Sequence, residues 1–205
     1  MAEQAAQSEP DKADTTGAPG ATQAERVDRL LDGDHESSDT AESPKTRRPL
    51  VVGIGASAGG LEALSAFFDT LPPDTGMTFV IVTHLSPNHE SILDELLQRH
   101  TAMPVIQVQA DEVAIAPNHV YIIPPRHQLV LTDHHLRTGE FENRRAAHAP
   151  IDIFLRSLAA RHAEPIAVIL SGGGSDGALG ARSVKEASGI VLVQDPQDAT
   201  HDSMP

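Results

Sequence analysis

Three residues with the chemistry of a hydrolytic site follow apolar segments of the chain: Ser57, His84 and Asp176. A serine hydroxyl becomes a nucleophile when a base removes its proton, and histidine suits that role because its unperturbed pKa is about 6.5. A carboxylate such as that of Asp176 selects the tautomer of the histidine and stabilises the imidazolium that forms. Together these residue types indicate nucleophilic catalysis by serine.

The segment around Ser57 fits two functional motifs. Residues 55–59, Gly-Ala-Ser-Ala-Gly, fit a nucleophile elbow, in which small neighbours permit a tight strand-to-helix turn. Residues 53–58, Gly-Ile-Gly-Ala-Ser-Ala, also fit a dinucleotide fingerprint, and a third interpretation is that the glycines only allow close packing. A ribose site requires an acidic residue after the next strand, where this chain has Thr83 and His84, and a P-loop would require a lysine after the glycines. The histidine therefore favours the nucleophile elbow.

Alternating apolar runs and helical periods predict the elements that carry these residues. Short apolar runs without alternation indicate strands buried on both faces of a parallel sheet, and they span residues 50–55, 79–83, 105–108, 166–170 and 190–193. Helical spacing of apolar residues predicts helices over residues 61–71, 91–99, 151–161 and 178–187, the last one closed by Gly189. Between them, residues 111–141 predict short strands and a hairpin that turns at residues 133–134.

This order of elements predicts an α/β fold with a doubly wound, mostly parallel, Rossmann-like three-layer sheet and an antiparallel hairpin insertion. The carboxyl ends of parallel strands share one edge of a sheet, so Ser57, His84 and Asp176 should meet there. Glycines around Ser57 and Asp176 leave backbone N–H groups to hold an oxyanion. Each residue also has a plainer alternative: Asp176 caps the helix that follows it, and His84 is one of 11 histidines, exposed at the surface.

The composition excludes several classes of protein. There is no cysteine, which excludes a disulfide framework, a cysteine nucleophile and a cysteine-ligated metal. The 29 acidic against 15 basic residues give a net charge of −14, which argues against a general nucleic-acid or anionic-membrane surface. His127, His134 and His135 lack acidic or thiol companions at ligand spacing, so we expect neither a metal nor a cofactor. Without an apolar run of about 18 residues or a secretory signal, we expect a soluble, cytoplasmic protein.

The chain divides into two parts by composition. Residues 1–49 hold 11 acidic and 6 basic residues, a net charge of −5, and few branched apolar residues. Such a segment buries too little apolar surface to offset its ordering entropy, so we expect residues 1–48 to be a disordered acidic tail. Residues 49–205 should form one domain with its own core.

Three segments together are diagnostic of a family. GIGASAGGLEAL, IVTHLSP and ILSGGGSDGALG begin at residues 53, 81 and 169, and in this order they resemble the catalytic domain of CheB-type chemotaxis methylesterases. Residues 115–125 (IAPNHVYIIPP), 148–158 (HAPIDIFLRSL) and 185–196 (KEASGIVLVQDP) are similar too. The resemblance runs from about residue 50 to residue 205.

The resemblance implies hydrolysis of glutamate methyl esters on the cytoplasmic helices of chemoreceptors, with deamidation of receptor glutamines as a related activity. It implies that Ser57 is the nucleophile, His84 the base and Asp176 its orienting partner. The backbone N–H of Gly173 and the loop residues Ala58 and Gly59 would form the oxyanion hole. No cofactor is implied, and the alternatives that remain are a nucleotide-binding module and a non-catalytic regulatory domain.

Some positions depart from the family pattern. Gly173 stands where the family often has methionine, Ala58 where it often has threonine, and Thr83 where it often has glutamine. Alanine at the position of Ala58 also occurs in similar domains that are fused to CheR-type methyltransferases. This chain therefore resembles that branch most, and we expect a CheR-type module as a partner.

Three expectations concern the whole chain. The 48-residue tail is too short and polar to be the phosphoreceiver domain typical of the family. Family members continue beyond Met204–Pro205, so we expect the domain to be truncated at its C-terminus. Docking to acidic receptor helices should depend on local positive charge, near Arg126, Arg144 and Arg145.

Overall fold

The computed structural model describes residues 49–84, 92–109, 111–141 and 143–205. These residues fall within the compact unit Thr46–Pro205. The tail predicted for residues 1–48 lies outside the described residues. None of the helices in the described part is long and apolar enough to cross a membrane.

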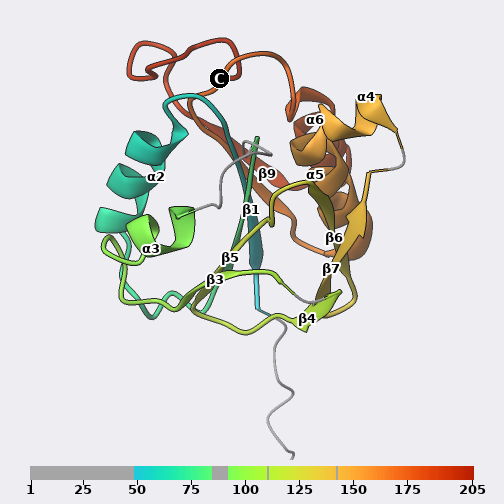
Figure 1. Cartoon of the computed structure of the whole chain (residues 1–205), viewed down its shortest axis with the longest axis horizontal. Coiled ribbons are helices and arrows are strands. Elements are labelled where there is room, and N and C mark those ends of the chain that lie inside the picture. Colours follow the sequence, from blue (N-terminus) through green and yellow to red (C-terminus); the bar gives the residue numbers. More distant parts are fainter. Residues whose placement is uncertain (1–48, 85–91, 110, 142) are drawn as a thin grey trace, which may run out of the picture. The chain divides into compact units, whose positions relative to one another are not determined.

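A six-stranded parallel sheet forms the centre of this unit, with the strand order β3-β5-β2-β1-β8-β9 (Figure 1). The strands pair in parallel throughout. Their bounds are β1 (Val51–Ala56), β2 (Thr78–Thr83), β3 (Val105–Gln107), β5 (His119–Ile122), β8 (Ile166–Ile169) and β9 (Ile190–Val193). A second, antiparallel sheet has the order β4-β7-β6 and consists of β4 (Glu112–Ala114), β6 (His127–Thr132) and β7 (His135–Glu140).

The register of the central strands brings the predicted site residues to one edge. Ala56 at the end of β1 pairs with Thr83 at the end of β2, so Ser57 and His84 leave adjacent strands at the same level. On its other side β1 pairs with β8, where Gly55 lies opposite Ile169. The loop after β8 therefore begins beside Ser57.

Helices cover both faces of the large sheet, as expected for a doubly wound fold (Figure 1). On one face α2 (Gly60–Asp69) and α3 (Leu93–Leu97) pack over a core that includes Leu64, Phe68 and Phe79. The aromatic rings of Phe68 and Phe79 meet edge to face, with centroids 5.5 Å apart. These contacts fix the helix that starts directly after Ser57.

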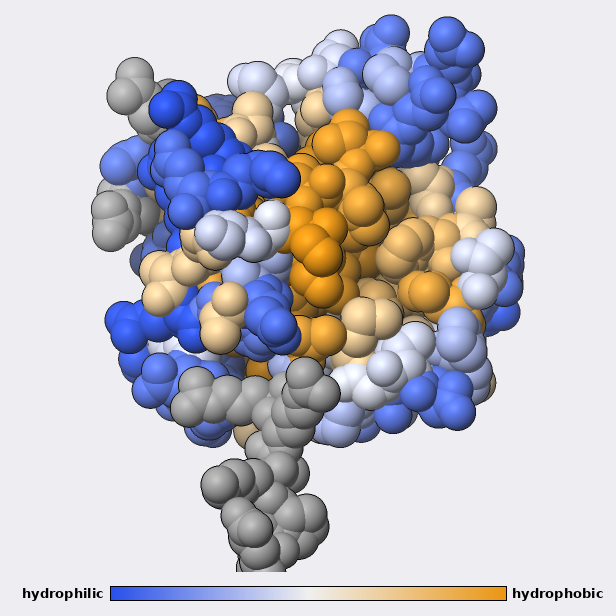
Figure 2. All heavy atoms as spheres, turned by 180° about the vertical axis from the view of Figure 1, so that it is seen from behind, coloured by the Kyte–Doolittle hydropathy of each residue, from blue (hydrophilic) through white to orange (hydrophobic). Residues whose placement is uncertain are grey.

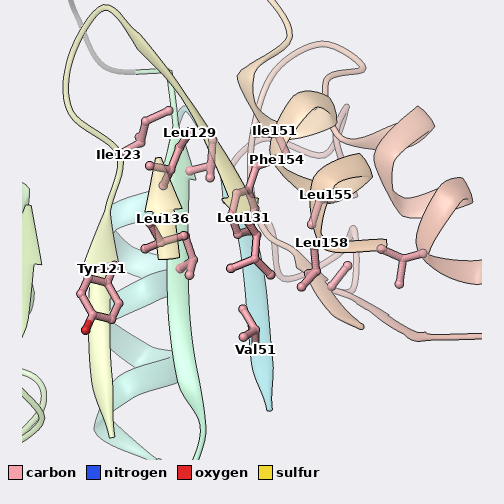
Figure 3. Close-up of a cluster of buried hydrophobic side chains, with 14 of the residues drawn as sticks. Val51, Tyr121, Ile123, Leu129, Leu131, Leu136, Ile151, Phe154, Leu155 and Leu158 are labelled. Atoms are coloured by element: carbon pink, nitrogen blue, oxygen red, sulfur yellow. The ribbon is translucent and has the colours of Figure 1, made fainter. Parts of the chain in front are cut away.

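The opposite face carries α5 (Pro150–Arg161), α6 (Ala178–Glu186) and the small antiparallel sheet. Apolar side chains of this sheet and of α5 form one buried cluster over the large sheet, which Figure 3 shows in close-up. Its labelled members are Val51, Tyr121, Ile123, Leu129, Leu131, Leu136, Ile151, Phe154, Leu155 and Leu158. The core thus packs the start of α5 against the strands.

The edge strand β9 is less covered than the rest of the sheet. Ile190, Leu192 and Val193 are each more than half exposed, although the strand is apolar throughout. Figure 2, the view from behind, shows an apolar area on this side of the molecule. β9 pairs with β8 along one edge and is the last strand in the order of the large sheet.

The predicted fold class is confirmed, one local prediction is corrected, and one helix is found that was not predicted. The short helix α4 (Arg144–Ala147) was not expected from the apolar pattern. Ser188, with φ 61°, adopts the left-handed conformation after α6, and Gly189 does not. Gly189 is instead a packing residue, because a Cβ there would overlap the carbonyl oxygen of Pro165.

Candidate functional site

Ser57 lies on a tight turn between β1 and α2. Its N–H donates to the carbonyl of Ser171 at 3.0 Å, and its own carbonyl accepts from the N–H of Gly60 at 2.9 Å. Gly59 in this turn has φ 72°, a conformation that favours glycine. A Cβ at Gly60 would lie 2.8 Å from the Cβ of Ala56, so the turn needs a small residue there. These features are those of a nucleophile elbow, with the serine partly exposed.

His84 lies between the other two predicted site residues. Its Nδ1 is 3.2 Å from Ser57 Oγ, and its Nε2 is 3.1 Å from Asp176 Oδ2. The tautomer with its proton on Nε2 donates to the carboxylate and leaves Nδ1 free to accept the serine proton. The structure therefore brings the three predicted site residues together, with the histidine ring between the serine hydroxyl and the carboxylate.

The surroundings favour the protonated form of His84. The hydrogen bond to Asp176 raises the pKa of His84 above 6.5, burial opposes this, and the charge of Asp176 and the backbone carbonyl of His148 add to the increase. The ring remains about one-third exposed. A histidine in this position is prepared to hold a proton taken from Ser57.

Asp176 caps the start of α5, whereas the plainer alternative from the sequence was that it caps the helix that follows it, α6. Its Oδ2 accepts from the N–H of Ile151 at 3.0 Å and its Oδ1 from the N–H of Asp152 at 2.9 Å, both in the first turn of α5. At the start of α6 the cap position is Gly177, and no side chain caps that helix locally. Asp176 is nearly buried, so these bonds hold its carboxylate in one orientation.

The sequence predicts an oxyanion hole formed by the backbone N–H groups of Ala58, Gly59 and Gly173. The structure shows no acceptor for the N–H groups of Ala58, Gly59 and Gly173 among the described residues. By contrast, the N–H of Gly172 donates to the carbonyl of His201 at 3.0 Å. Gly173 is exposed, and a side chain there would meet no atom within 4 Å. Gly173 also lines a cavity beside His84.

A cavity of about 650 Å³ opens beside the histidine. His84, Asp176 and Gly173 line it, but Ser57 does not. Arg126, which is exposed and has φ 65°, contributes a positive charge to the lining. The other lining residues are Thr83, Ile123, Pro124, His127, Phe141, Ala147, His148, Pro150, Gly174 and Ser175.

The sequence did not reveal two groups that shape this edge. The buried Ser171 donates from its Oγ to the carbonyl of Ala58 at 2.9 Å and accepts from the N–H of His201 at 2.9 Å. Met204 lies so close that a Cβ at Gly172 would overlap its sulfur. The only sequence signal was that Ser171 directly follows the apolar run of residues 166–170, and periodicity could not indicate that the last residues pack there.

The first two glycines of the dinucleotide motif do not lie in the loop where that interpretation requires them. Gly53 and Gly55 lie inside β1 and not in the loop that follows it. A Cβ at Gly53 would lie 2.8 Å from Leu155 Cδ2, and one at Gly55 would lie 2.5 Å from Ile151 Cγ2. These two glycines therefore allow α5 to approach the strand, which was the third interpretation of the motif.

The described residues contain no group of three or more His, Asp or Glu that could hold a metal ion. Nδ1 of His127 lies 2.7 Å from the carbonyl oxygen of Pro125, and Nδ1 of His135 lies 3.9 Å from Oε1 of Glu112. The side chains of Arg144 and Arg145, predicted to aid docking, lie outside the described residues.

Comparisons with known proteins identify the family of this site. The family model described as CheB methylesterase matches residues 52–205. A "Protein-glutamate methylesterase/protein-glutamine glutaminase 2" of Xanthomonas oryzae is 36% identical over 163 residues, which are 76% of this chain and 44% of that protein. An uncharacterised 104.1 kDa protein of Rhodobacter capsulatus is 45% identical over 111 residues, 54% of this chain and 11% of that protein.

A solved structure extends the comparison. The crystal structure of the Thermotoga maritima CheB methylesterase catalytic domain matches with a TM-score of 0.71 and 28% identity, covering 77% of this chain and 85% of that one. This chain spans less than half the length of the Xanthomonas and Rhodobacter relatives.

Proposed function

Because this chain belongs to the CheB methylesterase family, we propose that it is a serine hydrolase that removes methyl esters from glutamate side chains of chemoreceptors. The observation that carries the proposal is the line of contacts from Ser57 Oγ through His84 to Asp176, with distances of 3.2 and 3.1 Å. Both distances fall in the range of about 2.6–3.2 Å that is expected between a nucleophile, its base and the group that orients the base.

The proposed reaction has two steps. Nδ1 of His84 accepts the Ser57 proton while Oγ attacks the ester carbonyl, and Asp176 stabilises the imidazolium. The N–H groups of Ala58 and Gly173 donate to the oxyanion, and the imidazolium returns the proton as methanol leaves. The same histidine then takes a proton from water, whose oxygen attacks the acyl-enzyme, and returns the proton to Ser57 Oγ as the glutamate side chain leaves. A glutamine amide would follow the same path and release ammonia.

The proposed partners are methylated cytoplasmic domains of chemoreceptors and a CheR-type methyltransferase module, and the proposed compartment is the cytoplasm. A relative of this chain is named both a methylesterase and a glutaminase, which supports the two leaving groups. Receptor helices are acidic around their modified glutamates, whereas residues 50–205 hold 18 acidic and 9 basic residues, a net charge of −9. Arg126 in the wall of the cavity supplies the local positive charge that docking would require.

The test is methanol release from a methylated receptor cytoplasmic fragment. Ser57→Ala should lower kcat by a factor of roughly 10⁴ or more, because the nucleophile acts as part of a unit. Ser183→Ala, on the exposed side of α6, is the matched control and should keep the wild-type rate. Full activity of Ser57→Ala would refute the mechanism. Receptor binding without methanol release from the wild-type protein would identify a non-catalytic regulatory domain.

A further inference from the structure

A second buried carboxylate, that of Asp152, lies behind the candidate triad. It belongs to the first turn of α5 and is only 8% exposed. Its Oδ1 accepts from the N–H of Gly177 at 3.0 Å and from the N–H of Gly180 at 2.7 Å. Both N–H groups belong to the start of α6, whose cap position has no side-chain bond of its own. Asp152 therefore caps α6 from the neighbouring helix.

The two carboxylates cap each other's helices. Asp176 stands directly before Gly177 at the start of α6 and binds the N–H groups of Ile151 and Asp152 in α5. Asp152 in α5 binds the start of α6 in return. Each acid satisfies donors that a helix N-terminus leaves unpaired, and helix N-termini stabilise negative charge. The starts of both helices are thereby held in one relative position.

The sequence of α6 is adapted to this arrangement. A Cβ at Gly180 would lie 2.6 Å from the Cβ of Leu155 and 3.1 Å from the Cα of Asp152. Gly177 has φ 99°, which places its N–H toward α5 in a conformation that other residues rarely adopt. Two glycines thus allow α6 to approach α5 closely enough for the Asp152 carboxylate to reach both N–H groups.

We infer that Asp152 is a positioning residue for the proposed reaction: by holding the start of α6, it keeps the Asp176 carboxylate against Nε2 of His84. This inference rests on the proposed function insofar as Asp176 orients the base. Without Asp152, the Gly177 and Gly180 N–H groups lose their buried acceptor, and α6 is free to shift away from α5. Asp176, one residue before Gly177, would move with it.

Three variants separate positioning from stability. Asp152→Ala removes the acceptor, and kcat should fall roughly 10- to 100-fold, because a displacement of about 1 Å in a site costs that much. KM should change less than kcat, since Asp152 itself does not line the cavity beside His84. Asp152→Asn keeps an oxygen for both N–H groups and should retain most of kcat. Met103→Ala, a buried residue in the core on the other face of the large sheet, is the control that loses stability without touching either carboxylate or α5.

The decisive measurement is the titration of the His84 ring, followed by NMR without substrate and assigned with His84→Gln. The charged or titratable groups that line the same cavity are Asp176, Arg126, His127 and His148. In Asp152→Ala the midpoint should fall toward about 6.5, because the contact to Asp176 weakens. In Asp152→Asn and Met103→Ala the midpoint should stay at the wild-type value.

Two results would overturn the inference: an unchanged His84 midpoint in Asp152→Ala, or an equal decrease in Met103→Ala. If Asp152→Ala does not fold, Asp152→Ser takes its place with the same two criteria, since its short hydroxyl cannot reach both N–H groups. The NMR readout needs no turnover, so failure of the proposed esterase activity would be visible separately in the Ser57→Ala experiment.

Discussion

At the scale of single residues, the orientation of the His84 ring defines how the site works. Nε2 faces the carboxylate of Asp176 and Nδ1 faces the serine. The carboxylate and the carbonyl of His148 raise the pKa of His84, against the opposing effect of burial. A group whose pKa is raised in the folded protein adds stability below its unfolded pKa, and that stability is lost as pH rises through the folded pKa. The neutral form of His84, which the proposed reaction needs as its base, is therefore less populated at a given pH than that of an ordinary histidine.

This orientation predicts a pH dependence of the hydrolysis. The rate given by kcat/KM should increase with pH, and its half-maximal point should lie above about 6.5, because only neutral His84 can accept the Ser57 proton. In Asp176→Asn the rise of kcat/KM with pH should move to lower pH, because the charge that raises the pKa of His84 is lost, and the maximal kcat/KM should be lower. Steady-state kinetics across this pH range measure both. A wild-type half-maximal point at or below 6.5 would contradict the assignment of His84 as the base.

At the scale of elements, two glycines of β1 set how closely α5 packs. The Cβ positions of Gly53 and Gly55 are filled by side chains of α5, so the helix lies directly on the strand that leads to Ser57. The first turn of the same helix holds Asp176. Packing of α5 on β1 therefore sets the distance between Ser57 and the Asp176 carboxylate.

The packing predicts that Gly55→Ala is destabilising. The new Cβ would meet Ile151 Cγ2 at 2.5 Å, and such overpacking typically costs about 1–3 kcal/mol of unfolding free energy. Displacement of α5 should also reduce hydrolysis by the folded protein. Gly139→Ala in β7 is the control, because its nearest neighbour is the flexible Gln128 side chain at 3.4 Å. Urea unfolding compares the two, and equal stability would refute this role of Gly55.

At the scale of the whole described unit, the sheet is buried unevenly. The central strands β1 and β2 have almost no exposed residue, whereas three of the four β9 side chains are more than half exposed. The apolar area on this side is visible in Figure 2. An exposed apolar edge strand promotes association between molecules. Stability and solubility thus depend on different strands of one sheet.

Polar substitutions on β9 should improve solubility without loss of stability or activity. In the double variant Ile190→Thr and Leu192→Thr, the unfolding free energy should change by less than about 1 kcal/mol, because both side chains are already exposed. Light scattering of concentrated solutions should decrease. Phe68→Ala, buried in the core, is the contrasting variant and should cost about 3–5 kcal/mol. A loss of comparable size in the β9 variant would show that these side chains are covered in solution.

The sequence by itself determined the alternation of strands and helices and the three residues that meet at one edge, because apolar periodicity and strand polarity are local properties. It could not reveal that Asp176 caps α5 or that Asp152 caps α6, and it could not choose the packing role of Gly53 and Gly55 among its three interpretations. These contacts join residues far apart in the chain, so they exist only once the helices and strands have packed. Which nitrogen of His84 faces the serine was likewise decided by the tertiary structure, because the Asp176 carboxylate is held in place by a helix from another part of the chain.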